Sequence, residues 1–278
     1  DYALAYSNLG LALHDLGDLD AAIASYHQAL ALNPDCAEAH NNLGHALRYS
    51  GNFGEAFYCH RQAITLNPQN NSFWLGFAAC LETFSFTSVD DVLFEQLLHL
   101  VDRPFVHPAN LVPPIFSALQ LIPEFSKNLE QALSAGSEIE FSFGDVAEQL
   151  SAIPLFLRIL KLCPINVPTI ERALTILRHA MLRHTLAGQV NDRGLPFSAA
   201  LALQCFTNEY VNLETDAETE GLELLERNIA ALAETRRDIP PSFIVALAAY
   251  RPLNRFPWTQ ELLDIEWGNC IKEVVERQ

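Results

Sequence analysis

The first seventy residues repeat one pattern of small and large residues with a period of 34 positions. Segments 3–36 and 37–70 align without a gap. The residues that agree form the pairs Leu9/Leu43, Gly10/Gly44, Leu13/Leu47, Gly17/Gly51, Ala22/Ala56, Ala29/Ala63 and Pro34/Pro68. A period of this length is typical of repeat architectures, in which each unit buries its apolar side only against its neighbours. We therefore expect the chain to begin as a stack of similar units.

The order of residues within each unit predicts a helical hairpin. Leu9 and Leu13 are four residues apart, so they lie on one face of a first helix. Gly10 keeps this helix thin where a second helix approaches. Gly17 favours the left-handed conformation that ends a helix, and Asp18 can cap the helix that follows. The second unit repeats each feature and predicts a second hairpin.

This period and this order of residues resemble the tetratricopeptide (TPR) repeat, whose hairpins stack into a solenoid. The resemblance implies two TPR units, at 3–36 and 37–70. Because two units do not close a core alone, we expect neighbours on both sides. Asp1 and Tyr2 occupy the repeat phase of Asp35 and Cys36, so the chain is expected to be a fragment cut at a repeat boundary, whose cut end can self-associate.

The next segments lose the period. Residues 71–103 are expected to form a degenerate TPR-like helical pair, whose second helix is capped by Ser88 and turns Val92 toward a core. Prolines crowd residues 104–144, which predicts a linker with short helices. Within it, residues 138–144 alternate polar and apolar side chains, so they suit a short extended piece or a loop equally well.

Residues 145–278 predict an all-α helical domain. Apolar and amphipathic stretches, many of them bracketed by proline, follow one another without βαβ alternation. The predicted fold class is therefore all-α, a TPR hairpin solenoid followed by an α-helical bundle. One of these helices carries an acidic run, which is expected to be a solvated helix start or else a contact for a basic partner or for a domain outside this chain. The run consists of Glu214, Asp216, Glu218, Glu220, Glu223 and Glu226.

Composition narrows the classes of partner. The formal net charge of −17 and pI near 4.8 argue against nucleic acid, because phosphate binding needs clustered Lys and Arg. No apolar run approaches the roughly 20 residues of a membrane-spanning helix, so no membrane partner is expected. The remaining expectation is a polypeptide partner. The six cysteines have no paired spacing, which suits reduced thiols in the cytoplasm.

The second half of the chain carries its own resemblance. The stretch LPFSAALALQCFTNEYV at 195–211, with PLFLRILKLCPINVPTIERALTILRHAML before it and ALAAYRPLNRFPW after it, resembles the helical region that precedes the catalytic domain in bacterial TPR-containing class I SAM-dependent methyltransferases. The resemblance implies a catalytic domain beyond residue 278. No Gly-rich nucleotide motif occurs here, so no catalytic residue or cofactor is expected in this chain, and SAM only in the missing domain. The alternatives are an O-GlcNAc-transferase-like parent and a free-standing scaffold.

The sharpest site candidates are Asn8 and Asn42, which share one repeat phase on the two first helices. TPR first helices line an inner groove, and a side-chain amide can both donate to and accept from an extended peptide. This arrangement resembles the asparagine ladder of O-GlcNAc transferases. The alternative is that both amides only serve neighbouring backbone or solvent. The predicted flanking groove residues are Ser7, Leu11, His14, Asn41, His45 and Arg48.

Other chemistry is not expected. The pairs His40/His45 and His179/His184 are five residues apart, which places the members of each pair on diverging helix faces rather than in a metal site. His60 takes the phase of Tyr26 and is expected to loosen that helix contact slightly. Cys205 lies in the most apolar predicted helix, where a thiolate nucleophile is disfavoured.

Overall fold

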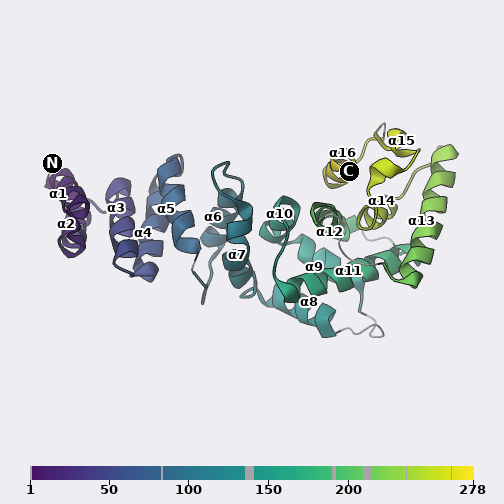
Figure 1. The fold of residues 1–278 in the computed structure, drawn as a ribbon, viewed down its shortest axis with the longest axis horizontal. Helices are drawn as coiled ribbons and strands as arrows, with labels where there is room; N and C mark the ends of the chain where they lie inside the picture. The colour runs from purple at the N-terminus through teal and green to yellow at the C-terminus, as the bar shows by residue number, and fades with distance from the viewer. Residues whose placement is uncertain are drawn as a thin grey trace. The chain divides into compact units, whose positions relative to one another are not determined.

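The structure, a computed structural model, describes residues 2–82, 84–134, 141–189, 192–208, 214–235, 237–263 and 265–278 (Figure 1). In these ranges the regular secondary structure is helical and contains no strand, which confirms the all-α class. No helix in the described ranges combines the length and the apolar character that a bilayer crossing requires. The chain divides into two compact units. Unit 1 comprises Asp1–Thr87 and His99–Pro114, and unit 2 comprises Ser88–Leu98 and Ile115–Gln278.

Unit 1 begins with the two predicted hairpins, and the signals that end and start their helices act as expected. Gly17 and Gly51 have φ of +81° and +85°, the left-handed region that ends a first helix. Asp18 accepts a hydrogen bond from the backbone of Ala21, which caps the second helix, and Asn52 caps its counterpart in the same way. The helices are α1 (Tyr2–Asp15), α2 (Leu19–Leu32), α3 (Ala37–Tyr49), α4 (Phe53–Leu66) and α5 (Asn71–Leu81).

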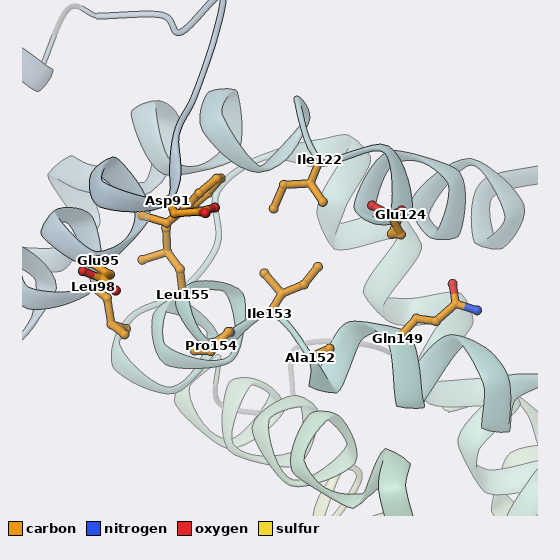
Figure 2. Close-up of a pocket in the computed structure, with 11 residues that line it drawn as sticks. Asp91, Glu95, Leu98, Ile122, Glu124, Gln149, Ala152, Ile153, Pro154 and Leu155 are labelled. Atoms are coloured by element: carbon orange, nitrogen blue, oxygen red, sulfur yellow. The ribbon is translucent and has the colours of Figure 1, made fainter.

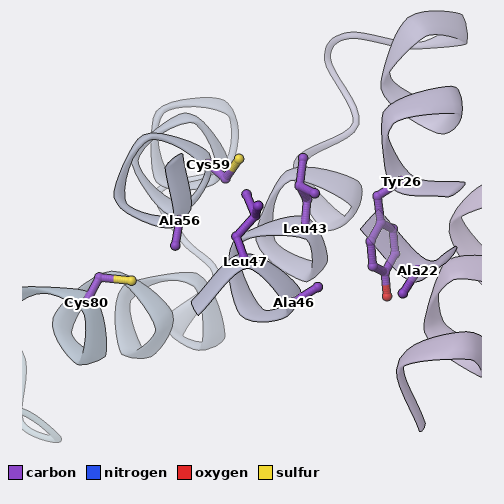
Figure 3. Close-up of a cluster of buried hydrophobic side chains, with 8 residues drawn as sticks. All are labelled: Ala22, Tyr26, Leu43, Ala46, Leu47, Ala56, Cys59 and Cys80. Carbon is purple, nitrogen blue, oxygen red and sulfur yellow. The ribbon is translucent and has the colours of Figure 1, made fainter. Parts of the chain in front are cut away.

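The core of unit 1 lies around α3 (Figure 3). Helix α2 packs on one side of α3, and α4 and α5 pack on the other. Small residues let the helices approach closely, while Tyr26, Leu43 and Leu47 fill the space between them. The buried cluster consists of Ala22, Tyr26, Leu43, Ala46, Leu47, Ala56, Cys59 and Cys80.

The predicted equivalence of Leu9 and Leu43 is wrong in one respect. Leu43 is 2% exposed because α2 of the preceding hairpin covers it, whereas Leu9 is 49% exposed. In the described residues, no helix covers Leu9 in the way that α2 covers Leu43. The repeat phase therefore predicts which face a residue is on, and the neighbouring hairpin decides whether that face is buried.

The third helical pair differs from its prediction in detail. Helix α6 (Asp91–Val101) is capped by Asp90, whose carboxylate accepts a hydrogen bond of 2.7 Å from the backbone of Leu93, and not by Ser88. Its buried stripe follows Leu93, Leu97 and Leu100 at helical spacing, which leaves Val92 49% exposed rather than inward. The division between the units falls within α6, after Leu98.

The proline-rich segment 104–144 contains the expected short helices but is not simply a linker. Its described helices are η1 (Pro108–Leu111), α7 (Val112–Leu119) and α8 (Pro123–Ser134). The prolines at 113, 114 and 123 lie in first turns, where a missing N–H costs nothing. Phe116 and Phe125 are buried with ring centroids 6.3 Å apart, so the segment contributes to the core of unit 2. Of the suggested extended piece, residues 138–140 lie outside the described residues, and Phe143 begins a helix.

Unit 2 is organised around α12 (Leu195–Thr207), as its apolar sequence predicts. This helix packs against α9, α10, α14 and α16, and all its residues from Phe197 to Cys205 are buried. Burial raises the pKa of the Cys205 thiol to about 11, as expected for a thiol that is not a nucleophile. Residues 209–211, the last three of the stretch 195–211, lie outside the described residues. The remaining helices are α9 (Phe143–Ser151), α10 (Pro154–Leu162), α11 (Pro168–Leu186), η2 (Asp192–Gly194), α13 (Asp216–Glu234), α14 (Pro241–Ala248), η3 (Leu253–Arg255), α15 (Thr259–Leu263) and α16 (Asn269–Arg277).

The acidic run at the start of α13 is not simply a solvated face. Glu218 is buried, and one of its oxygens accepts a hydrogen bond from the hydroxyl of Tyr250 and lies 3.0 Å from Nε2 of His179 and 3.8 Å from Nη2 of Arg178. Its other oxygen accepts from the backbone N–H of Thr215 at 2.8 Å and completes a capping box. Burial alone would raise the pKa of Glu218, but the bonds from Tyr250 and Thr215 and the nearby His179 outweigh it and hold the pKa below its usual range.

Two further carboxylates of the run are also used inside unit 2. Arg251 lies 3.0 Å from Glu214 through Nη2 and pairs with Glu226 through Nη1. The members of the run that remain exposed are Asp216, Glu220 and Glu223. The prediction of a solvated helix start therefore holds for only part of the run, because cations from α11 and from the segment after α14 reach the rest.

Candidate functional site

The predicted peptide-binding residues lie on the first helices of the two hairpins, α1 and α3, which pack against each other. Asn8 is exposed on α1 and Asn42 is half-buried on α3. Within the described part of the chain, neither amide makes a hydrogen bond. The donors and acceptors of both amides are therefore available to another molecule. The alternative, that these amides only bond to neighbouring backbone, is not supported by any such hydrogen bond.

Ser7 and Asn41, also predicted for the groove, are placed elsewhere. Their side chains are buried, with exposures of 6% and 5%. Oδ1 of Asn41 accepts a hydrogen bond of 3.1 Å from Nδ1 of His60 on α4. This repeat phase precedes that of Asn8 and Asn42 by one residue, or about 100° of helix rotation, which turns it toward the hairpin interior. Ser7 and Asn41 are therefore structural residues.

The other predicted residues share one surface with the two free asparagines. Positions 8, 11 and 14 on α1, and 42, 45 and 48 on α3, recur every third residue and so follow one side of each helix. We call this surface the α1/α3 face. It consists of Asn8, Leu11, His14, Asn42, His45 and Arg48.

One end of the α1/α3 face carries a cluster of rings and a cation. The guanidinium of Arg48 lies 4.8 Å from the ring centroid of Tyr49, and the ring of His14 lies 5.5 Å from the same centroid. Tyr49 is 62% exposed and was not among the predicted site residues. The signal that could have found it is an aromatic residue beside an arginine in the last turn of a first helix.

The electrostatics of this end favour a hydrogen-bond acceptor as ligand. Nε of Arg48 and Nε2 of His14 are buried atoms without a hydrogen-bond partner. Burial lowers the pKa of His45, and the charges of Arg48 and His14 lower it further, so this imidazole is neutral at neutral pH. Arg48 thus supplies the positive charge. A carbonyl or carboxylate oxygen from a bound chain would be attracted by this charge, because the Arg48 side chain is only half-buried.

His60 tightens the second hairpin rather than loosening it. Its ring is fully buried between α3 and α5, where a Cβ added to Gly44 would lie 2.7 Å from its Nε2 and one added to Gly76 would lie 2.4 Å from its Cε1. Gly76 takes the repeat phase of Asn42, so the imidazole occupies the space that a third asparagine would need. This contact gives a physical reason why the predicted ladder of asparagines stops at two.

Burial makes His60 a source of acid sensitivity. Desolvation, followed by the nearby His45 and Arg48, lowers the pKa of His60 from 6.5 to about 3. The folded state therefore binds fewer protons than the unfolded state between these values, and the stability of unit 1 falls as the pH drops below about 6.5. We expect His60→Phe to reduce the slope of unfolding free energy against pH by up to ~1.4 kcal/mol per pH unit in this window. Urea unfolding at several pH values between about pH 4 and pH 7 measures this slope.

The matched control for this prediction is His27→Phe, because His27 is an exposed histidine on α2. It should leave the pH dependence as in the parent protein. An unchanged slope in His60→Phe would show that His60 does not remain neutral in the folded state.

His40 and Trp74, which share one repeat phase, stabilise the fold. Nε2 of His40 donates to the carbonyl of Pro34, and Nε1 of Trp74 donates to the carbonyl of Pro68, each at 2.8 Å. Arg103 adds a second bond to the Pro68 carbonyl and lies over the Trp74 ring at 4.7 Å. Both side chains thus bind the carbonyl at the break between successive hairpins. No group of three or more His, Cys, Asp or Glu residues with metal-site geometry occurs among the described residues.

Comparison with protein families agrees with the geometry of unit 1. Residues 10–48 match a family described as TPR repeat, and residues 37–70 match a family described as tetratricopeptide repeat. The chain therefore contains TPR repeats, a class of helical module that serves protein–protein interaction. Neither match extends beyond residue 70, and no curated protein matches the chain.

Proposed function

We propose that unit 1 binds an extended polypeptide along the α1/α3 face. The observation that carries this proposal is the pair of unbonded amides of Asn8 and Asn42, which repeat at the same phase of successive first helices. An extended backbone offers alternating N–H and C=O groups, and a primary amide can engage both. Because these contacts reach the backbone of the ligand, the face is expected to tolerate varied sequences.

The cluster of Arg48, His14 and Tyr49 is expected to give the α1/α3 face its preference for particular peptide groups. Arg48 is the only residue of the α1/α3 face with a permanent charge, and it is half-buried, so part of its side chain remains accessible to a ligand. A peptide carboxylate or carbonyl placed there would make a charge-assisted bond. The exposed ring of Tyr49 and the exposed side chain of Leu11 offer apolar contact to such a peptide.

The double variant Asn8→Ala with Asn42→Ala is expected to bind peptide about tenfold or more weakly, because it removes two to four hydrogen bonds worth roughly 0.5–1.5 kcal/mol each. Its free energy of unfolding should change by less than ~0.5 kcal/mol, since neither side chain supports the fold. Peptides selected from a random display library on the parent protein provide the ligands. Fluorescence anisotropy of the labelled peptides then gives both affinities.

The matched control is Gln28→Ala with Gln62→Ala. These two glutamines also share one repeat phase, but they lie on the second helices α2 and α4. This variant should bind the selected peptides as the parent does. Equal affinity in the parent and in the double-asparagine variant would rule out the α1/α3 face as the peptide site.

We further propose that the bound polypeptide is presented to a SAM-dependent methyltransferase domain of the same parent chain. The support is the resemblance of residues 145–278 to the helical region that precedes such domains. In this proposal SAM binds only that domain, and the protein works in the cytoplasm, which its six free cysteines favour. Reading the coding sequence beyond codon 278 tests it. A strand followed by a Gly-rich turn would support it, whereas a glycosyltransferase sequence or an immediate stop codon would overturn it.

A further inference from the structure

Unit 2 contains a cavity of about 520 Å³ that has no part in the proposed peptide site (Figure 2). Its walls come from α6, the start of α8, the end of α9 and the start of α10. Ile122 and Ile153 approach its middle from opposite sides in Figure 2. The lining residues are Asp91, Phe94, Glu95, Leu98, Ile122, Glu124, Gln149, Ala152, Ile153, Pro154 and Leu155.

The charge of the lining has a single sign. Asp91 and Glu95 are one turn apart on α6, and Glu124 stands across the cavity on α8 (Figure 2). No lysine, arginine or histidine is among the described lining residues. In the same described ranges, none of these three carboxylates makes an ion pair. The cavity therefore combines an apolar wall with uncompensated negative charge on two sides.

The one neutral polar side chain of the lining, Gln149, is engaged through its oxygen. Oε1 of Gln149 accepts a hydrogen bond of 3.0 Å from Nδ2 of Asn128, which is itself buried. The NH2 group of Gln149 can still donate to a ligand acceptor, but it is uncharged, so the three carboxylates set the sign of the charge that a ligand meets. Carboxylates attract cations and repel anions, so an apolar acid is excluded as the preferred ligand.

We propose that this cavity binds a small apolar amine, a ligand with an alkyl or aryl body and one protonated nitrogen. The body would lie against Ile122, Ile153 and Leu155, where burial of apolar surface drives binding. The ammonium group would remain at the rim beside Asp91 and Glu95, partly hydrated and attracted by both. This inference concerns unit 2 alone and does not depend on the proposed peptide site.

The test compares three probes that share one apolar body, namely 3-phenylpropylamine, 3-phenylpropanol and 3-phenylpropanoate. Titration of the full chain, followed by NMR chemical shifts, gives the three affinities. We expect the amine to bind about fivefold or more tightly than the alcohol, and the acid to bind most weakly. Raising the salt concentration from about 20 mM to about 300 mM should reduce the advantage of the amine and leave the alcohol unchanged.

Two variants locate the site. The double variant Asp91→Asn with Glu95→Gln should lower the affinity for the amine to that for the alcohol while preserving alcohol binding. Ala152→Phe places a ring at the cavity wall and should abolish binding of both probes. The matched control is Glu130→Gln, an exposed glutamate on α8 outside the lining, which should change none of the affinities.

Each opposite outcome overturns the proposal. Equal binding of the amine and the acid would show that the carboxylates do not select the ligand. Amine binding that survives Ala152→Phe would place the ligand elsewhere on the acidic surface. Absence of binding by all three probes, in a protein whose circular dichroism shows it folded, would show that the cavity is not a site for this class of ligand.

Discussion

Gly44→Leu is expected to unfold the hairpins of unit 1 while leaving unit 2 folded. A Cβ at this position would lie 2.7 Å from Nε2 of His60, closer than unbonded atoms approach. The imidazole cannot move aside, because Gly76 contacts its other edge and Asn41 holds its Nδ1. The smaller change Gly44→Ala should cost about 2 kcal/mol, because overpacking outweighs the gain in helix propensity.

Hydrogen exchange followed by mass spectrometry separates the two units in this experiment. Backbone protection in residues 1–70 should be lost in Gly44→Leu, and protection in α11 and α12 should persist. Gly54→Ala is the matched control, because Gly54 lies in the first turn of α4 with no atom within 4 Å of an added Cβ. It should be neutral or stabilise by up to ~1 kcal/mol. Parent-like protection in Gly44→Leu would show that the contact between His60 and Gly44 is not fixed.

Glu218→Ala is expected to cost ~3–5 kcal/mol of unfolding free energy, because it leaves a buried charge without a counter-ion. Arg178 is 1% exposed, its guanidinium lies 4.2 Å from the ring centroid of Tyr250, and Glu218 is the carboxylate that faces it. The substitution also removes the acceptor of the Tyr250 hydroxyl and the reciprocal bond to Thr215. Urea unfolding of the full chain measures the loss.

Two companion variants identify the cause of this loss. Glu218→Gln keeps the capping geometry, since glutamine also closes a capping box, and removes only the charge, so it should cost less than alanine. Glu220→Ala, at an exposed position two residues later, should change the stability by less than ~0.5 kcal/mol. A loss below ~1 kcal/mol in Glu218→Ala would mean that Arg178 is neutralised or solvated in some other way.

The parts of the fold that the sequence predicts well are those determined by local chemistry. Gly17 can adopt a positive φ and Asp18 can accept a bond from its own helix, so the hairpin turn follows from adjacent residues. The same holds for α12, because a helix whose residues are almost all apolar is stable only when it is buried. The 34-residue period adds the register between hairpins, because residues at one repeat phase lie on the same face of their helices.

The predictions that were wrong depend on partners distant in the sequence. Glu218 has the appearance of a solvated helix-start glutamate, and only the fold brings Arg178 and Tyr250 to it. Leu9 has the phase of a core residue, yet it is exposed in the described residues, whereas α2 covers Leu43. Asn41 differs from Asn42 by one position, and the presence of His60 on another helix makes it structural.

The candidate sites follow the same division. Asn8 and Asn42 could be proposed from a repeat, because each repeat places its first helix in the same way. The cavity of unit 2 could not be proposed, because its wall combines residues from α6, α8, α9 and α10 that share no sequence pattern. A single apolar residue such as Ile153 looks like ordinary core until its neighbours are known.

The imidazole held between Gly44 and Gly76 limits how this array can be edited. Repeat arrays are often treated as interchangeable modules, yet the second hairpin here accepts only a following helix with a glycine at the position of Gly76. In the first hairpin, Tyr26 takes the place of His60, and the following helix carries Asn42 at that position. New hairpins can therefore be joined at the break after Asn33, whereas residues 37–81 must be transplanted as one piece.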